Sequence, residues 1–176
     1  YAEEPYSFML TTLLHDLGKA DTTEFINGRY HAYNHENELG RANSFLNRIG
    51  ASNDVKRYCR NMIPLHMKPH IIAHDKSSVK ASNKMFDQAI SKTDLILVAV
   101  SDGCPKESLE FLTERLTIFD KMMAEPFVTG ADLLAAGYRP GEQFGRLLKY
   151  AHKLRLAGVD KGSALKQIRS LERNDK

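Results

Sequence analysis

Apolar residues recur at the spacing of an α-helix along most of this chain, and this periodicity constrains its fold more than any other feature. A first set lies on one side of a helix that Gly18 can end: Met9, Leu10, Leu13, Leu14 and Leu17. A second set follows a helix start near Asn34: Leu39, Ala42, Phe45, Leu46 and Ile49. Repeated amphipathic helices of this kind predict a fold in which helix packs on helix.

The rest of the chain continues the helical pattern. Ser52 or Asn53 can cap the next helix, and Ser82 can cap the one after it. The apolar run 95–100 fits a buried strand or a buried helix, and we predict a helix because nothing nearby resembles a partner strand. Another helix is expected over residues 111–119, and three more begin at Ala131, Glu142 and Ser163. The predicted fold class is therefore all-α.

The length of the chain favours one main domain with a tail. Its 176 residues, 42% of them hydrophobic, can bury one sizeable core. A loop around Glu125 and Pro126 is the predicted boundary between a helical domain, residues 1–125, and a basic helical tail, residues 126–176. Because the chain begins with Tyr1 and not with methionine, we expect it to be a piece of a longer or processed protein.

Nothing in the sequence predicts a membrane or secreted protein. The longest uninterrupted apolar run, residues 95–100, is too short to cross a bilayer, and no signal peptide is visible. The two cysteines, Cys59 and Cys104, form neither a disulfide framework nor a Cys-x-x-Cys motif. We therefore expect a cytoplasmic protein without a membrane partner.

Positive charge is concentrated towards the C-terminus. Residues 139–176 carry 10 Lys and Arg against 4 Asp and Glu, a net charge of +6, whereas residues 1–138 carry 15 against 18, a net charge of −3. Arg146, Lys149 and Lys153 have spacings that place several of them on one exposed helix stripe. Such a stripe can contact the phosphates of RNA, although an ordinary solvated helix face explains the same charges equally well.

His15 and Asp16 stand side by side near the end of the first predicted helix. A neutral imidazole beside a carboxylate offers the mixed nitrogen and oxygen donors that suit catalytic divalent metals. At 100° per residue Asp16 lies beside the apolar stripe and His15 opposite it, so both helix faces should be covered inside a bundle. Asp102 ends the run 95–100 at the mouth of the core, where a carboxylate needs a cation or a hydrogen-bond partner. A chance dipeptide and an ordinary turn residue are the alternative interpretations.

The remaining histidines fall into two groups: His35 and His66 are possible distant partners of His15 and Asp16, and the others are given ordinary roles. His66 and His70 have i, i+4 spacing, but Pro69 between them argues against a continuous metal-binding helix face. Three others are interpreted as surface or core residues: His31, His74 and His152.

Four short motifs follow one another along the first domain: Leu14-His15-Asp16-Leu17-Gly18-Lys19, Tyr33-Asn34-His35-Glu36 with Leu39-Gly40, Leu65-His66-Met67-Lys68-Pro69, and Ser101-Asp102. Together they resemble the HD superfamily of metal-dependent phosphohydrolases. The tail carries three more: Pro126-Phe127-Val128-Thr129-Gly130-Ala131-Asp132-Leu133-Leu134, Gly137-Tyr138-Arg139-Pro140-Gly141, and Phe144-Gly145-Arg146-Leu147-Leu148. These are similar to the C-terminal region of bacterial tRNA nucleotidyltransferases and poly(A) polymerases that contain an HD domain.

The resemblance implies an HD-type helical bundle with a short C-terminal helical extension. It makes His15, Asp16 and Asp102 ligands of a divalent metal ion (Mn, Ni, Co, Mg or Fe), with His35 and His66 as additional histidines. The family also has a histidine on an earlier helix, and no histidine precedes His15 in this sequence. The nucleotidyltransferase head has no counterpart here either, so the chain alone is not expected to add nucleotides.

The activity implied is hydrolysis of phosphomonoesters, nucleotides or 2′,3′-cyclic phosphates by a metal-activated water. Lys19 and Lys68 are predicted to neutralise charge on the phosphate, and His35 or His66 to carry protons to the leaving group. The alternative function is that of a non-catalytic RNA-binding module of a tRNA nucleotidyltransferase. In that case the metal site is degenerate and retained as structure, and the basic tail contacts tRNA.

Overall fold

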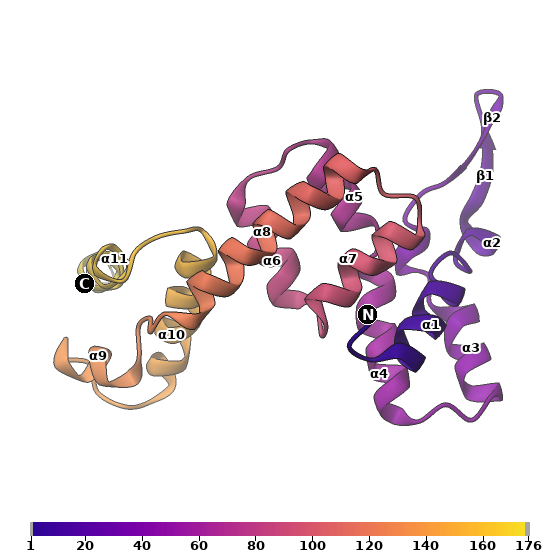
Figure 1. Cartoon of the computed structure of the whole chain (residues 1–176). Helices are drawn as coiled ribbons and strands as arrows, with labels where there is room; N and C mark the ends of the chain where they lie inside the picture. Colours follow the sequence, from indigo (N-terminus) through magenta and orange to yellow (C-terminus); the bar gives the residue numbers. More distant parts are fainter. Residues whose placement is uncertain (1, 175–176) are drawn as a thin grey trace.

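The computed structural model describes residues 2–174 as a chain of helices with one small β-hairpin (Figure 1). The α-helices are α1 (Pro5–Leu14), α2 (Lys19–Thr22), α3 (Gly40–Arg48), α4 (Asn53–Met62), α5 (Met67–His74), α6 (Val79–Gln88), α7 (Lys92–Ser101), α8 (Lys106–Ala124), α9 (Gly130–Ala135), α10 (Glu142–Leu156) and α11 (Lys161–Asn174). The other elements are two 3₁₀ helices, η1 (His35–Asn37) and η2 (Ile63–Leu65), and two strands, β1 (Thr23–Ile26) and β2 (Arg29–Ala32). The predicted all-α class is confirmed, with the hairpin as a small addition. No helix in the described range combines the length and the apolar character that crossing a membrane requires.

Three groups of buried apolar side chains form the core. The largest joins α4 to α8 and includes Phe86 and Leu95. A second packs α1 against α3 and α4 and includes Leu14 and Leu46. The third lies wholly within residues 127–168, so the C-terminal extension has a small core of its own. In Figure 1 this extension lies at one end of the molecule, and α1, α3 and the hairpin lie at the other.

The predicted helix starts are correct in some places and wrong in others. Ser52 caps α4 as expected, because its hydroxyl oxygen accepts a hydrogen bond from the Val55 amide. The run 95–100 lies within α7, as predicted. Ser78, not Ser82, caps α6, and Ser82 is buried inside that helix. The helix expected near Asn34 begins only at Gly40, because Asn34 has a left-handed φ of 58° and precedes a 3₁₀ turn instead.

The hairpin was not predicted. β1 pairs antiparallel with β2, with Thr23 opposite Ala32 and Phe25 opposite Tyr30. Asn27 and Gly28 connect the strands, and both have positive φ, 51° and 81°. Asn-Gly is the preferred sequence for a two-residue turn with this geometry, because both residues tolerate positive φ. The sequence therefore contained a hairpin signal that helical periodicity does not reveal.

A buried carboxylate fixes the start of α1. Asp94 of α7 is fully buried and accepts hydrogen bonds from the Glu3 and Glu4 amides at 2.8 and 3.3 Å. It also accepts a hydrogen bond from the Tyr58 hydroxyl of α4. Burial, reinforced by this bond to Asp94, raises the pKa of Tyr58 far above its ordinary value, so the phenol stays protonated. Through these contacts α1, and the turn that follows it, are held against α4 and α7.

Candidate metal centre

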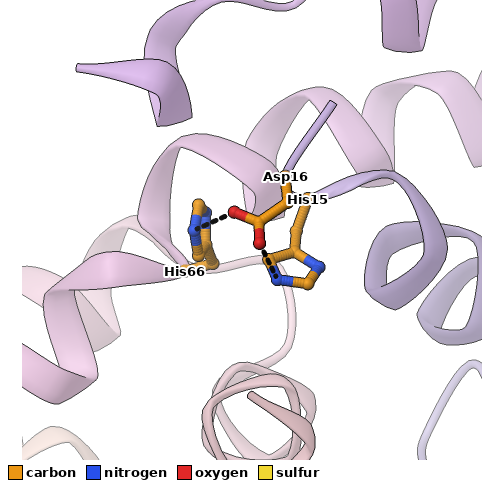
Figure 2. A group of neighbouring side chains, drawn as sticks. All are labelled: His15, Asp16 and His66. Atoms are coloured by element: carbon orange, nitrogen blue, oxygen red, sulfur yellow. Dashed lines mark ion pairs between the residues drawn. The ribbon is translucent and has the colours of Figure 1, made fainter. Parts of the chain in front are cut away.

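The side chains predicted to bind a metal come together from segments that are distant in sequence. His15 and Asp16 follow the last residue of α1, and His35 begins η1. His66 lies between η2 and α5, and Asp102 directly follows α7. Figure 2 shows the Asp16 carboxylate between the imidazoles of His15 and His66.

Several pairs of donor atoms lie close together. His15 Nε2 lies 3.3 Å from Asp16 Oδ2 and 3.5 Å from Asp102 Oδ1. His35 Nε2 lies 3.1 Å from Asp16 Oδ1, and His66 Nε2 lies 3.9 Å from the same oxygen. Atoms held about 2.1 Å from one ion at octahedral or tetrahedral angles lie about 3.0–3.4 Å apart. Most of these distances are therefore close to those between ligands of one ion.

Three histidine rings are oriented in the same way. The Nδ1 atom of His15 lies 2.8 Å from the Thr12 carbonyl oxygen, three residues earlier in the chain. His35 and His66 make the equivalent contacts, at 2.9 and 2.7 Å, each with the carbonyl oxygen three residues earlier. Because a carbonyl oxygen can only accept, Nδ1 carries a proton in each ring, and in the neutral form of the ring Nε2 keeps its lone pair. Protein ligands of divalent metals are commonly fixed in this way.

The centre leaves polar atoms without ordinary partners. His35 Nε2 and His66 Nε2 are 3.3 Å apart, and in the tautomers fixed by the carbonyls both atoms are acceptors. His15 Nε2 and Asp16 Oδ1 are buried and make no aligned hydrogen bond within the described part of the chain. Facing lone pairs and unpaired buried acceptors are costly unless a proton or a cation lies between them. His15, Asp16 and His66, whose ligand atoms lie within 4.8 Å of one another, could therefore hold a metal ion.

The surroundings keep the donor atoms in the state that binds metal. Burial lowers the pKa of His66, so this imidazole is neutral at physiological pH. For Asp16 burial by itself raises the pKa, but the hydrogen bond and charge of the Lys19 ammonium, together with the charge of protonated His15 and His35, outweigh burial and lower the pKa overall. Both groups therefore have lone pairs available near neutral pH.

His70 also lies beside the predicted ligands, although Pro69 argued against a metal-binding helix face at this position. Its Nε2 lies 3.1 Å from Asp102 Oδ2 and is buried without an aligned hydrogen bond. Pro69 does not break α5, because it occupies the first turn, where an amide hydrogen has no partner within the helix. The i, i+4 spacing of His66 and His70 was the sequence signal for His70. It could be interpreted correctly only if α5 was known to begin at Met67, which places Pro69 in the first turn.

The backbone segment that carries His15 and Asp16 also differs from the prediction. They were expected to occupy opposite faces of one helix, but α1 ends at Leu14 and they lie in the turn that follows. The 100° rule therefore does not apply to them, and both side chains point to the same centre. Gly18 allows this turn to approach η1, since a Cβ at Gly18 would lie 2.1 Å from the His35 carbonyl oxygen.

The predicted phosphate-binding lysines lie in different places. Lys19 Nζ contacts Asp16 Oδ2 at 2.7 Å and is about half exposed, so it lies at the rim of the centre. Lys68 donates to the Gln88 side chain of α6 at 2.7 Å. Through Gln88, Lys68 is connected to a groove between α6 and α10.

The basic residues of the extension lie along α10. Arg146, Lys149 and Lys153 are all exposed. Lys149 and Lys153 line a groove of about 550 Å³ together with Lys84 of α6, and Gln88, the partner of Lys68, lies in the same groove. The positive surface therefore includes residues of the body as well as of the tail.

Comparison with known proteins adds no relative: no family model, no curated protein and no solved structure matches this chain.

Proposed function

We propose that this protein is a divalent-metal-dependent phosphohydrolase of the HD type. The observation that carries the proposal is the convergence of imidazole Nε2 atoms on the Asp16 carboxylate, with each ring oriented by a backbone carbonyl. His15, Asp16 and Asp102 are the proposed core ligands, and His66 joins His15 and Asp16 in a group whose ligand atoms lie within 4.8 Å of one another. His35 and His70 flank this group, so that a coordination position stays open for water. A divalent ion bound there would polarise a phosphoryl oxygen and supply a water nucleophile near neutral pH.

The side chains of the chain itself then have distinct roles. His35 and His66 bind and orient, and we do not assign them proton transfer, because their Nε2 atoms face the other donors. Lys19 stands at the rim, where its ammonium can pass from Asp16 to a phosphate oxygen and neutralise developing charge. Phosphomonoesters, nucleotides and 2′,3′-cyclic phosphates are the substrates that this arrangement supports.

The proposal is tested by metal content and by hydrolysis. The purified chain is loaded in turn with manganese, nickel, cobalt, magnesium and iron, and phosphate release from monoesters and cyclic phosphates is measured. His15→Ala and Asp16→Ala are expected to lose metal and turnover while keeping the helical circular dichroism spectrum. His74→Ala is the matched control, because His74 is 89% exposed on α5. Equal turnover in wild type, H15A and D16A would refute the proposal.

A second candidate function is RNA binding, favoured by the groove between α6 and α10. Lysines from two helices, Lys84, Lys149 and Lys153, surround this groove, which is the arrangement expected for contact with a phosphate backbone. In the corresponding alternative the chain binds tRNA without hydrolysing it.

Binding of tRNA at increasing salt tests this candidate. Replacing Lys149 and Lys153 with alanine is expected to weaken binding and to reduce the salt dependence by about two phosphate contacts. Lys106→Ala with Lys121→Ala, on α8, removes the same charge elsewhere and serves as the control. Equal losses in both double variants would show a non-specific charge effect.

A further inference from the structure

The β-hairpin presents aromatic side chains to solvent. Phe25 and Tyr30 face each other across the strands, with ring centroids 5.0 Å apart and exposed fractions of 64% and 77%. Tyr33, just after β2, is 65% exposed and stacks on His31 at an interplanar angle of 10°. Figure 1 shows the hairpin projecting from the bundle. A cross-strand aromatic pair stabilises a hairpin, and rings exposed to this extent also offer a face on which a flat ligand can stack.

The hairpin is continuous with the metal centre. Its last residue, Ala32, provides the carbonyl that orients His35, and the side chain of Thr23 donates to the carbonyl of Lys19. Phe25 and Tyr30 stand two residues beyond the Thr23–Ala32 pair, about 7 Å at the rise of an antiparallel strand. The aromatic rings therefore stand on an element whose base is hydrogen-bonded to the residues that form the centre.

We propose that the hairpin binds the nucleobase of a nucleotide whose phosphate occupies the metal centre. This inference rests on the proposed function and narrows its substrates to nucleotides and the ends of RNA strands. A base offers a flat π-face that stacks on tyrosine or phenylalanine, and a nucleotide joins that face to a phosphate through a single sugar. Lys19 at the foot of the hairpin and Arg29 at its tip supply positive charge for phosphates along such a ligand.

The test compares two ligands that differ only in the base. Equilibrium dialysis with manganese-loaded protein gives dissociation constants for adenosine 5′-monophosphate and ribose 5-phosphate, and phosphate release gives their kcat/KM values. Wild type is expected to prefer the nucleotide by about tenfold or more. Replacing both Phe25 and Tyr30 with alanine is expected to reduce this ratio towards one.

Two variants serve as controls. Tyr30→Phe keeps the ring and is expected to keep the preference for the nucleotide. Tyr6→Ala removes a similarly exposed tyrosine from α1, and we expect the ratio to stay as in wild type. The readout is the ratio of the affinities, or of the kcat/KM values, for the two ligands. A general disturbance of the metal centre weakens the binding of both ligands and leaves this ratio unchanged, whereas loss of stacking lowers it.

The outcomes separate this inference from the proposed function. If neither ligand binds or reacts, the phosphohydrolase itself is wrong, and the inference fails with it. If both bind or react equally well in wild type, the phosphohydrolase stands and base stacking is refuted. If the double variant keeps the ratio but changes the sedimentation of the protein, the hairpin is a self-association surface, and the inference is overturned.

Discussion

His70 is the residue whose role changes most between sequence and structure. Because its Nε2 contacts Asp102 and lacks an aligned hydrogen bond, we expect His70→Ala to weaken binding of manganese or cobalt by about 10- to 100-fold. His74→Ala, one turn later on the same helix, is expected to bind as wild type does. Titration calorimetry with each metal measures the difference. Equal affinities for the two variants would remove His70 from the centre.

Gly18 provides a second test at the scale of single residues. A methyl group there would lie 2.1 Å from the His35 carbonyl oxygen, so Gly18→Ala must displace η1 and the His35 ring. We expect a loss of about 1–3 kcal/mol in the free energy of unfolding, together with weaker metal binding. Gly145→Ala in α10 meets nothing within 4 Å and is expected to stabilise by about 0.5–1 kcal/mol. Urea denaturation measures the free energy of unfolding of both variants, which should fall for Gly18→Ala and rise for Gly145→Ala.

Much of the candidate centre could be predicted from residue types and motifs. The chemistry of His15 and Asp16 and the resemblance that adds Asp102 predict a metal site, and the structure places His15 Nε2 3.3 Å from Asp16 and 3.5 Å from Asp102. His70 was missed because Pro69 has opposite meanings in the first turn and in the interior of a helix. The sequence does not show where α5 begins, so it cannot decide whether Pro69 lies in the first turn or in the interior of the helix.

Among the elements, α9 offers a prediction about pH. Asp132 accepts hydrogen bonds from Lys161 and from the hydroxyl and amide of Thr129, which together lower the pKa of its carboxyl group to about 2. Its ordinary pKa is about 3.9, so the stabilisation is present above pH 4 and is lost as the pH falls towards 2. Asp132→Asn should therefore lower Tm most above pH 4 and least near pH 2.

Thermal unfolding followed by circular dichroism between pH 2 and pH 6 measures this dependence. Asp54→Asn is the control, because Asp54 is 88% exposed at the start of α4. If the difference in Tm between wild type and D132N stayed the same at every pH, the ionised Asp132 carboxylate would not be the group that stabilises α9.

Helices were predicted correctly where the apolar periodicity or a single capping residue marks them without a competing signal nearby. Ser52 caps α4 because its side chain has no competing role. Ser82 has the same chemistry but lies inside α6, because Ser78 four residues earlier performs the capping. The hairpin carried its own signal, Asn27-Gly28, which an analysis based on helical spacing does not detect.

At the scale of the whole molecule, Arg155 connects the extension to the body. Its guanidinium donates to the carbonyl oxygens of Met122 and Glu125 at the end of α8 and lies over the Phe127 ring. Arg155→Ala is expected to loosen the segment 125–129 and to speed its cleavage by protease about tenfold. Arg169→Ala on α11, where the side chain is exposed, should leave the cleavage rate unchanged. Limited proteolysis followed by mass spectrometry locates the cut, and equal rates for the two variants would contradict this role.

The hydrogen bonds from Glu3 and Glu4 to Asp94 have a consequence for how the molecule is made. A ribosome delivers α1 long before it delivers α7, so the N-terminus of α1 emerges without its partner Asp94 and is held at first only by packing against α3 and α4. Only after Asp94 and Asp102 leave the exit tunnel can the nascent chain close this end of the bundle. Under the proposed function, a cation can be captured only after this closure, when the helices that carry the ligands have come together.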